Sequence, residues 1–278
     1  MEIFVNYIKE NDRILICDKS DFNIDDTLLC GQIFSYQKTL EGYDVFSKDK
    51  RATVIKKENG YEIITKDVDY FENFFDLKTD YASIKRGLEK HPILKKPIAY
   101  GGGIRILRQD LFETLLSFII SANNNIKRIQ LILNRLRESL GENMGDFHAF
   151  PTRERLIAKD VDFFKAIGAG YRADYLYKVL REVDEEKLKR LNALPTDALR
   201  KELIALSGVG PKVADCVLLF GYGRKDVFPV DTWIAKMYAK FYQPLSNREE
   251  IRRRLTSEFG ELAGYAQQYL FYYMREGG

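Results

Sequence analysis

Between residues 32 and 66 the chain alternates short apolar runs with turn residues. Each run is rich in aromatic and β-branched residues, which is typical of strands in an antiparallel sheet. Asn59-Gly60 separates the last two runs and favours a tight type I′ hairpin. The pattern therefore predicts a β-meander over residues 32–66, with runs at 32–37, 43–47, 51–57 and 61–65.

The hydrophobic spacing becomes helical after the meander. One helix is expected at residues 70–89, and the two prolines and three consecutive glycines within residues 91–103 indicate a domain boundary. Apolar residues then recur every three or four positions, which predicts a series of helices. These helices are expected at about residues 112–119, 126–140, 153–166, 172–190, 197–206, 211–221, 231–242, 247–259 and 262–275.

The elements indicate an α+β fold. A chain of 278 residues also fits two domains at about 150 residues each. We expect a small N-terminal antiparallel β domain at residues 1–98 and a larger all-α domain at residues 99–278. Within the second domain, a helix–hairpin–helix is expected at about residues 197–221.

Composition narrows the class of protein. Hydrophobic residues make up 45% of the chain, charged residues 31% and aromatic residues 13%, as in a folded globular protein. No apolar run reaches the roughly 18 residues of a membrane span, which excludes a membrane protein. The N-terminal MEIFVNYIKE has no secretory pattern, so we expect an intracellular location, which in a prokaryote would be the cytoplasm or nucleoid.

Cysteine and histidine usage argues against disulfide and metal chemistry. Cys17, Cys30 and Cys216 form no CxxC pair, and His91 and His148 are far apart in the sequence. We therefore expect no disulfide framework and no metal at the catalytic site.

The charge distribution gives a weak hint of a partner. Residues 1–100 carry a net charge of −2, whereas residues 101–278 carry +5, within a total of +3. A local positive excess favours a phosphate-bearing partner, and solvated helix faces explain it about as well.

A glycine-rich turn lies between two of the expected helices. Ser207-Gly208-Val209-Gly210 precedes Pro211, which suits the first turn of a helix because its missing N–H is not needed there. Backbone N–H groups of Gly208, Val209 and Gly210 would adjoin the unpaired N–H groups of that helix and could hold a phosphate. Taken alone, the turn also fits a purely structural corner between helices.

Two ionisable residues flank this segment. Lys212 follows the turn in the first turn of a helix, where the macrodipole disfavours an ammonium ion and so favours the nucleophilic amine. Asp231 begins another helix nineteen residues later, and its carboxylate could face the lysine. A helix N-cap is the alternative interpretation of Asp231.

Five segments together resemble a known family. LSGVGPKVADC at 206–216, followed by FPVD at 228–231, resembles the signature of the helix–hairpin–helix DNA glycosylase superfamily, whose bifunctional members carry the lysine. The other segments are similar to its 8-oxoguanine DNA glycosylase branch and occur in that family's order. They are CGQIF at 30–34, LRQD at 107–110 with SFIISANNNI at 117–126 and Arg128, GAGYRA at 168–173, and AGYAQ at 263–267 with Phe271.

The resemblance implies a repair enzyme without a cofactor that acts on double-stranded DNA containing 8-oxoguanine, preferably opposite cytosine, as a monomer. The intracellular location would then be DNA-associated. The damaged base would be flipped out of the duplex. Lys212 would attack C1′ and form a Schiff base that eliminates the 3′ phosphate, while Asp231 would stabilise positive charge on the sugar.

The resemblance also assigns two groups of binding residues. Those matching the lesion-base pocket are Gly31, Cys216, Gln267 and Phe271. Asn123, Arg128 and Arg172 match the residues that read the opposite cytosine. Tyr171 matches an aromatic wedge that fills the vacated stack. Without the resemblance, Gly31 fits an ordinary turn glycine, Cys216 a core residue and Gln267 a solvated helix residue. Arg128 and Arg172 then fit surface charges.

Departures from the family pattern leave alternatives open. Trp233 stands where eukaryotic members usually have a histidine, Tyr265 replaces a tryptophan, and Ala122 replaces a common serine. The four-cysteine iron–sulfur tail of pyrimidine-lesion and adenine-removing relatives is absent. A glycosylase with another lesion preference, and a non-catalytic helix–hairpin–helix DNA-binding module, are the competing hypotheses.

Overall fold

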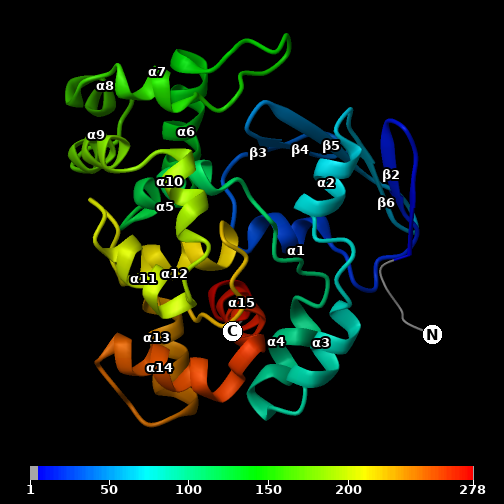
Figure 1. The fold of residues 1–278 in the computed structure, drawn as a ribbon. Coiled ribbons are helices and arrows are strands. Elements are labelled where there is room, and N and C mark those ends of the chain that lie inside the picture. Colours follow the sequence, from blue (N-terminus) through cyan, green and yellow to red (C-terminus); the bar gives the residue numbers. More distant parts are fainter. Residues whose placement is uncertain (1–5, 278) are drawn as a thin grey trace. The chain divides into compact units, whose positions relative to one another are not determined.

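The computed structural model describes residues 6–277 and contains a six-stranded sheet in its N-terminal part (Figure 1). The strand order is β1-β2-β6-β5-β4-β3, and the sheet is antiparallel. The predicted meander supplies the last four strands, although residues 32–35 of its first run lie outside β3, whereas β1 and β2 were not predicted. The strands are β1 (Tyr7–Lys9), β2 (Arg13–Ile16), β3 (Tyr36–Lys38), β4 (Gly42–Ser47), β5 (Lys50–Lys56) and β6 (Tyr61–Ile64).

One face of the sheet carries the core of this region. Ile14 and Ile16 of β2 are buried while their neighbours are partly exposed, as the two-residue period of a strand requires. They pack in one apolar cluster with helix α1 (Ile24–Leu29), helix α2 (Val68–Phe74) and Leu107. Burial of these apolar side chains joins the segment before α5 to the sheet.

The single helix predicted at residues 70–89 is wrong. Helix α2 ends at Phe74, and a second helix, α3 (Tyr81–Leu88), begins after an interruption. Asp76 adopts a positive φ of 53°, which a helix does not tolerate, and Asp80 caps α3 by accepting a hydrogen bond from the Ser83 amide at 3.0 Å.

The predicted type I′ turn is also wrong. Lys56 pairs with Tyr61, which leaves a four-residue loop closed by the Lys57 amide on the Gly60 carbonyl at 3.0 Å. Gly60 is needed for another reason, because a Cβ there would lie 1.8 Å from the Ile16 carbonyl oxygen of β2.

Helices make up the rest of the described chain, and most follow the predicted ranges. The interval expected as a boundary contains the turn η1 (Pro92–Leu94) and α4 (Lys95–Tyr100). Two predicted helices are each divided, because Asp160 and Asp184 cap a new helix within them. The other elements are α5 (Leu111–Ser121), α6 (Ile126–Leu140), α7 (Arg153–Ile157), α8 (Val161–Ala166), α9 (Arg172–Glu182), α10 (Glu185–Leu191), α11 (Thr196–Ile204), α12 (Pro211–Phe220), α13 (Thr232–Phe241), α14 (Arg248–Phe259), η2 (Gly260–Leu262), α15 (Ala263–Tyr272) and η3 (Tyr273–Gly277).

The chain forms two compact units that are discontinuous in sequence. Among the described residues, the first contains 6–45, 52–108 and 223–277, and the second contains 46–51 and 109–222. Helices α13 to α15 thus belong to the unit that holds most of the sheet. The expected division at residues 1–98 and 99–278 remains a prediction, and its outer limits lie outside the described residues. Within residues 6–277, none of the helices is both long and apolar enough to cross a membrane.

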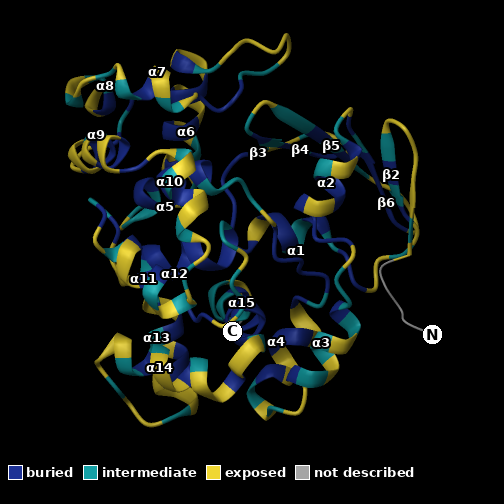
Figure 2. Ribbon diagram, viewed as in Figure 1, coloured by how far each residue is buried: buried dark blue, intermediate teal, exposed yellow. Residues whose placement is uncertain are grey.

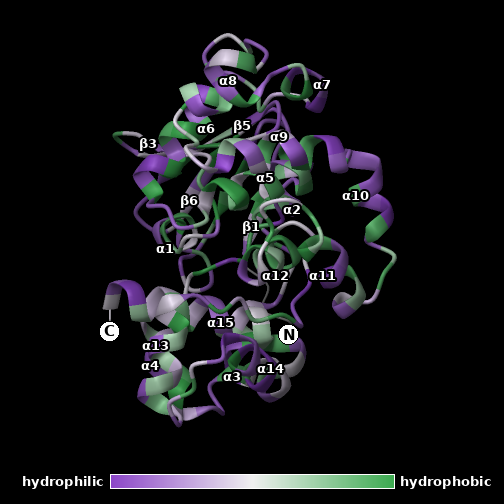
Figure 3. Cartoon of the chain, turned by 90° about the vertical axis from the view of Figure 1, so that its left-hand side faces the viewer, coloured by the Kyte–Doolittle hydropathy of each residue, from purple (hydrophilic) through white to green (hydrophobic). Residues whose placement is uncertain are grey.

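The second unit is built around α5 and α12. Helix α5 is apolar along most of its length (Figure 3), and every residue from Phe112 to Ile120 is buried. Helix α12 is buried from Val213 to Phe220 (Figure 2). Phe118 of α5 stacks on Phe220 of α12 with ring centroids 5.5 Å apart. This packing holds the end of α12 against α5.

Candidate active site

Helices α11 and α12 form the predicted helix–hairpin–helix. Gly208 has a φ of 79°, and a Cβ at this position would lie 2.6 Å from the Cβ of Tyr175, so both backbone conformation and space require glycine. Pro211 is the first residue of α12 and follows Gly210, which caps the helix without a side chain. The Val209 amide donates to the Leu206 carbonyl at 3.1 Å, so a phosphate would have to share or replace this bond.

A buried ion pair joins the two helices of the motif. Arg200 of α11 donates from Nε to Asp215 Oδ1 at 2.6 Å and from Nη2 to Oδ2 at 3.2 Å. Asp215 is 2% exposed, so this two-point contact is shielded from water. It fixes α11 against α12 and thereby holds the hairpin in one shape.

A carboxylate already occupies part of the hairpin. Glu182, at the end of α9, accepts hydrogen bonds from the Ser207 amide at 2.8 Å and from the Ser207 hydroxyl at 2.5 Å. The hairpin thus attracts a negatively charged oxygen group. Because Glu182 is exposed, it also places a negative charge beside any phosphate that approaches.

Lys212 lies in the first turn of α12, directly after the hairpin. Its amine stands 5.2 Å from the centre of the Phe118 ring, within the range of a cation–π contact. Among residues 6–277, no carboxylate forms a salt bridge with Lys212, so the amine is not held by an ion pair. Cys216 lies one turn further along α12 and is buried, which the core interpretation also predicts.

Asp231 is the N-cap of α13. Its Oδ1 accepts a hydrogen bond from the Ile234 amide at 2.9 Å, so the capping interpretation is confirmed. Capping uses one carboxylate oxygen and fixes the orientation of the other. Lys212 belongs to the second unit and Asp231 to the first, and their cooperation remains a prediction.

Gly31 lies in a turn that several side chains hold in place. It has a φ of 78°, and the Cys30 carbonyl before it accepts a hydrogen bond from Gln268 Nε2 of α15 at 2.7 Å. Gln32 is fully buried and bridges the Thr27 carbonyl and the backbone of residues 105–107. Burial raises the pKa of the Cys30 thiol to about 12, which disfavours the thiolate form.

The structure brings three predicted lesion-pocket residues together in the first unit. Phe271 and Gln267 are one turn apart on α15, and a Cβ on Gly31 would lie 3.1 Å from Phe271 Cε1. Gln267 is 5% exposed, and its Oε1 is buried without a hydrogen-bond partner among residues 6–277. A buried polar atom without a partner is costly, and a bound ligand would satisfy it. Cys216, the fourth predicted member, belongs to the other unit.

The four residues predicted to face the opposite base also gather, within the second unit. The Ala122 carbonyl accepts hydrogen bonds from the Tyr171 hydroxyl at 3.1 Å and from Arg172 Nε at 2.8 Å. Arg172 also donates to the carbonyls of Ala169 and Asn123 and is 4% exposed. In this conformation Arg172 holds the loop before α6, and a contact to cytosine would compete with these bonds.

Arg128 is the exposed cation of this group. It stands in the first turn of α6 and donates to the Gly168 carbonyl at 3.3 Å, a long and weak contact. Asn123 adopts a positive φ of 50°, which asparagine tolerates better than most residues. Tyr171 is 53% exposed, as a wedge residue should be.

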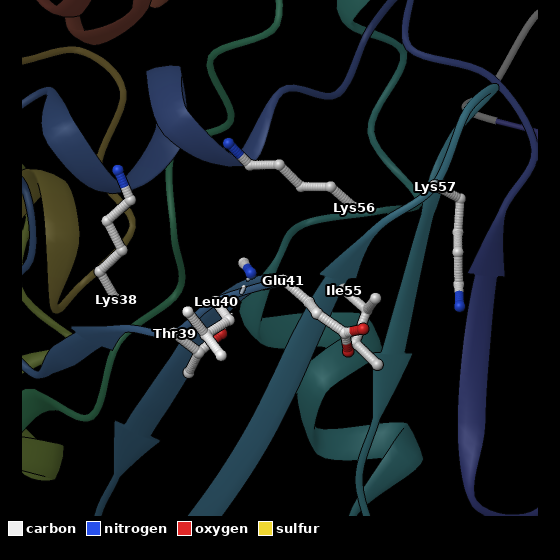
Figure 4. A pocket seen from close by; sticks show the side chains of 8 residues that line it. Lys38, Thr39, Leu40, Glu41, Ile55, Lys56 and Lys57 are labelled. Carbon is white, nitrogen blue, oxygen red and sulfur yellow. Dashed lines mark hydrogen bonds between the residues drawn. The ribbon is translucent and has the colours of Figure 1, made fainter.

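A surface pocket at the β3–β4 hairpin does not belong to the candidate site. It is lined by the segments at 38–42 and 55–57, and Figure 4 shows Lys57 pointing away from Lys38 and Lys56. Lys56 and Lys57 are already paired with Asp25 and Glu62. Over the described part of the chain, no cluster of His, Cys, Asp and Glu is arranged to hold a metal ion.

Sequence reasoning missed several residues that shape the site. Two of them, Gln268 and Arg275, donate hydrogen bonds to the carbonyls of Cys30 and Leu29, just before Gly31. The third, Glu182, accepts a hydrogen bond from the Ser207 hydroxyl at the hairpin. Their only sequence signal is nearness to Gln267, Phe271 or the hairpin. Two residues that depart from the family pattern make ordinary structural contacts. Trp233 is partly exposed beside Lys236, and Tyr265 is buried against Tyr81.

Two family models match consecutive parts of the chain. Residues 14–115 match the N-terminal domain of 8-oxoguanine DNA glycosylase, and residues 116–261 match the HhH-GPD superfamily base excision DNA repair proteins. The chain belongs to the HhH-GPD superfamily of base excision DNA repair proteins. The α+β fold predicted for this HhH-GPD protein is confirmed.

Three relatives illustrate the similarity. A probable N-glycosylase/DNA lyase of Methanothermobacter thermautotrophicus is 34% identical over 74% of either chain. The N-glycosylase/DNA lyase of Saccharomyces cerevisiae is 33% identical over 61% of this HhH-GPD protein and 56% of the yeast chain. The 8-oxoguanine glycosylase/lyase of Clostridium acetobutylicum, in complex with double-stranded DNA containing cytosine opposite 8-oxoG, is 37% identical, with a TM-score of 0.90 over 99% of both chains.

Proposed function

We propose that the protein is a bifunctional DNA glycosylase and AP lyase that excises 8-oxoguanine, preferably opposite cytosine, and nicks the resulting abasic site. The single observation that carries this proposal is the position of Lys212, directly after the hairpin and beside Phe118, without a carboxylate partner among residues 6–277. The match to two glycosylase family models supports it. The protein is thus a DNA-associated repair enzyme that acts on duplex DNA, and we expect a monomer.

The amine of Lys212 would attack C1′ of the damaged nucleotide. The N-glycosidic bond breaks, its electron pair leaves with the base, and the base gains a proton. Loss of the ring oxygen bond at C1′ gives a Schiff base between Lys212 and the sugar, and removal of a C2′ proton expels the 3′ phosphate. The carboxylate of Asp231 would stabilise the positive charge that develops on the sugar as the base departs.

Base recognition is divided between two groups of residues. The lesion would stack on Phe271 and present its N7 hydrogen to the Gly31 carbonyl, while the unpartnered Oε1 of Gln267 accepts from its Watson–Crick edge. Cys216 would form the other wall. The opposite cytosine offers O2 and N3 as acceptors, which suit the donors of Asn123 and Arg128. Tyr171 would fill the vacated stack.

Borohydride trapping tests the proposed function most directly. The purified protein is incubated with duplexes carrying 8-oxoguanine opposite each of the four bases, together with a duplex carrying other damaged purines. Covalent capture on 8-oxoguanine, most rapid opposite cytosine, is the expected result. Capture only on another lesion would assign a different substrate, and binding without capture would indicate a non-catalytic DNA-binding module.

Arg128→Ala is expected to narrow the preference for cytosine over the other opposite bases by about 1–3 kcal/mol, the scale of a good side-chain contact to a base. Discrimination between 8-oxoguanine and guanine should persist, because the lesion-reading residues are unchanged. Single-turnover excision from all four pairings measures both effects. Lys127→Ala, which removes the adjacent exposed charge on α6, is the control. Full cytosine preference in the Arg128 variant would remove the residue from this role.

Glu182→Gln is expected to strengthen duplex binding about two- to five-fold at low salt, since it removes a negative charge beside the hairpin while keeping an acceptor for Ser207. The gain should shrink as salt is raised. Fluorescence anisotropy with an undamaged duplex measures it. Glu186→Gln, on the exposed face of α10, controls for net charge. Equal gains in both variants would contradict a phosphate contact at the hairpin.

A further inference from the structure

The guanidinium group of Arg275 lies between two residues of the proposed lesion pocket. Its Cζ stands 5.1 Å from the centre of the Phe271 ring, in cation–π contact. Its Nη1 lies 2.8 Å from the position that a Cβ on Gly31 would occupy. Arg275 therefore lies over the Phe271 ring and close to Gly31, whose Cβ position is nearest the edge of the same ring. All three residues belong to the first unit, so their contacts are internal to it.

Defined hydrogen bonds hold Arg275 in this place. Its Nη2 donates to the Leu29 carbonyl, two residues before Gly31, and its Nε donates to Glu276 at 2.7 Å. Its side chain is 15% exposed, so the guanidinium is mostly withdrawn from water. The residue stands in η3, a single π-helical turn after α15. A long side chain on one turn of helix can leave through rotation about its own bonds.

The position of Arg275 is incompatible with a base in the same pocket. A purine that stacks on Phe271 and reaches the Gly31 carbonyl needs the volume that the guanidinium fills. The space between the two residues is narrow, because a Cβ on Gly31 would lie 3.1 Å from Phe271 Cε1. We propose that Arg275 gates the lesion pocket: it closes the pocket in the free enzyme and must swing away before a flipped base can enter. This inference rests on the proposed function.

In this proposal a flipped base replaces the Arg275 guanidinium on the Phe271 ring. The guanidinium stabilises the exposed π-face of Phe271 until a base replaces it with a stacking contact of its own. Every extrahelical base must displace the same cation and its bond to Leu29, so a base that binds the pocket weakly stays excluded. Arg275 thereby sets a threshold for entry and is not itself a catalytic residue.

Binding of the free base 8-oxoguanine tests the gate without DNA or catalysis. Isothermal titration calorimetry of Arg275→Ala should show binding about three- to ten-fold tighter than in wild type, because no cation has to be displaced. Arg253→Ala, which removes a charge from an exposed position on α14 of the same unit, should bind as wild type does. Weaker binding by Arg275→Ala would make the residue a base ligand, and unchanged binding would show that it does not close the pocket. Either result overturns the proposal.

A second measurement uses the wild-type protein and does not depend on the folding of a variant. The Nε–Hε resonance of Arg275, assigned by its loss in Arg275→Lys, should shift on addition of 8-oxoguanine as the guanidinium leaves Phe271. A resonance that stays in place at saturating base contradicts the gate.

Excision assays separate this inference from the proposed function. If wild type excises 8-oxoguanine from a duplex while Arg275→Ala gains neither base affinity nor single-turnover rate, the gate alone fails. If wild type excises nothing from an 8-oxoguanine duplex, the proposed function fails, and so does the gate that rests on it.

Discussion

Replacing Lys212 by glutamine is expected to abolish borohydride trapping on 8-oxoguanine duplex and to reduce base excision by at least about three orders of magnitude. An amide has no nucleophilic nitrogen, so no Schiff base can form. Duplex affinity should change little, because the hairpin, the Arg200–Asp215 pair and the position of α12 do not depend on the amine. Gel electrophoresis of trapped complexes and anisotropy on the same samples measure the two effects.

Lys225 supplies a demanding control for this experiment. Burial lowers the pKa of its amine to about 8, so Lys225 has a substantial neutral fraction in mildly alkaline solution. Its Nζ is buried without a hydrogen-bond partner in the described residues and lies 5.5 Å from the Tyr265 ring centre. Lys225→Gln should trap as wild type does, because an enclosed amine does not reach a nucleotide. If trapping persists in Lys212→Gln but is lost in Lys225→Gln, the nucleophile is Lys225 and not Lys212.

Asp231→Asn is expected to lower the single-turnover excision rate by two orders of magnitude or more, about 3 kcal/mol, with little change in DNA affinity. Asparagine caps helices as well as aspartate does, so the bond to the Ile234 amide can persist while the negative charge is lost. The expected loss therefore comes from the missing charge near the sugar and not from the fold. Rapid-quench excision and thermal melting are measured together.

Asp184 offers a matched comparison for Asp231. It caps α10 by accepting a hydrogen bond from the Lys187 amide at 2.6 Å and lies outside the candidate site. Asp184→Asn should leave the excision rate unchanged. If Asp231→Asn retains both the wild-type melting temperature and the wild-type excision rate, the charge has no catalytic role and capping is the whole role of Asp231.

Local pattern was sufficient for most of the fold. Helix α6 was predictable because a three- to four-residue apolar period marks one buried face, and α12 was predictable because Pro211 marks a helix start after a glycine-rich turn. It failed where local signals were short or ambiguous. Strands β1 and β2 lie before the predicted meander, in a segment where no period was recognised, and one positive φ at Asp76 divides a segment whose spacing looked continuous.

The site was predictable only through resemblance. Nothing in the local pattern distinguishes Gly31 from another turn glycine, or Arg128 from a surface charge. The structure then gathered Gly31, Gln267 and Phe271 in one unit, and Arg128 with the loops at 122–125 and 168–172 in the other. Their functional roles remain predictions, which the variants above address.

The sequence by itself determined the helix–hairpin–helix, the candidate nucleophile Lys212 and the family resemblance, because these depend on residue types at fixed short spacing. Only the tertiary structure decided what each of these groups touches. The Gln268 bond to the Cys30 carbonyl joins residues 238 positions apart, and Arg275 reaches Leu29 across 246. Contacts over such separations leave no periodic trace in the chain, because chain folding and side-chain packing create them together.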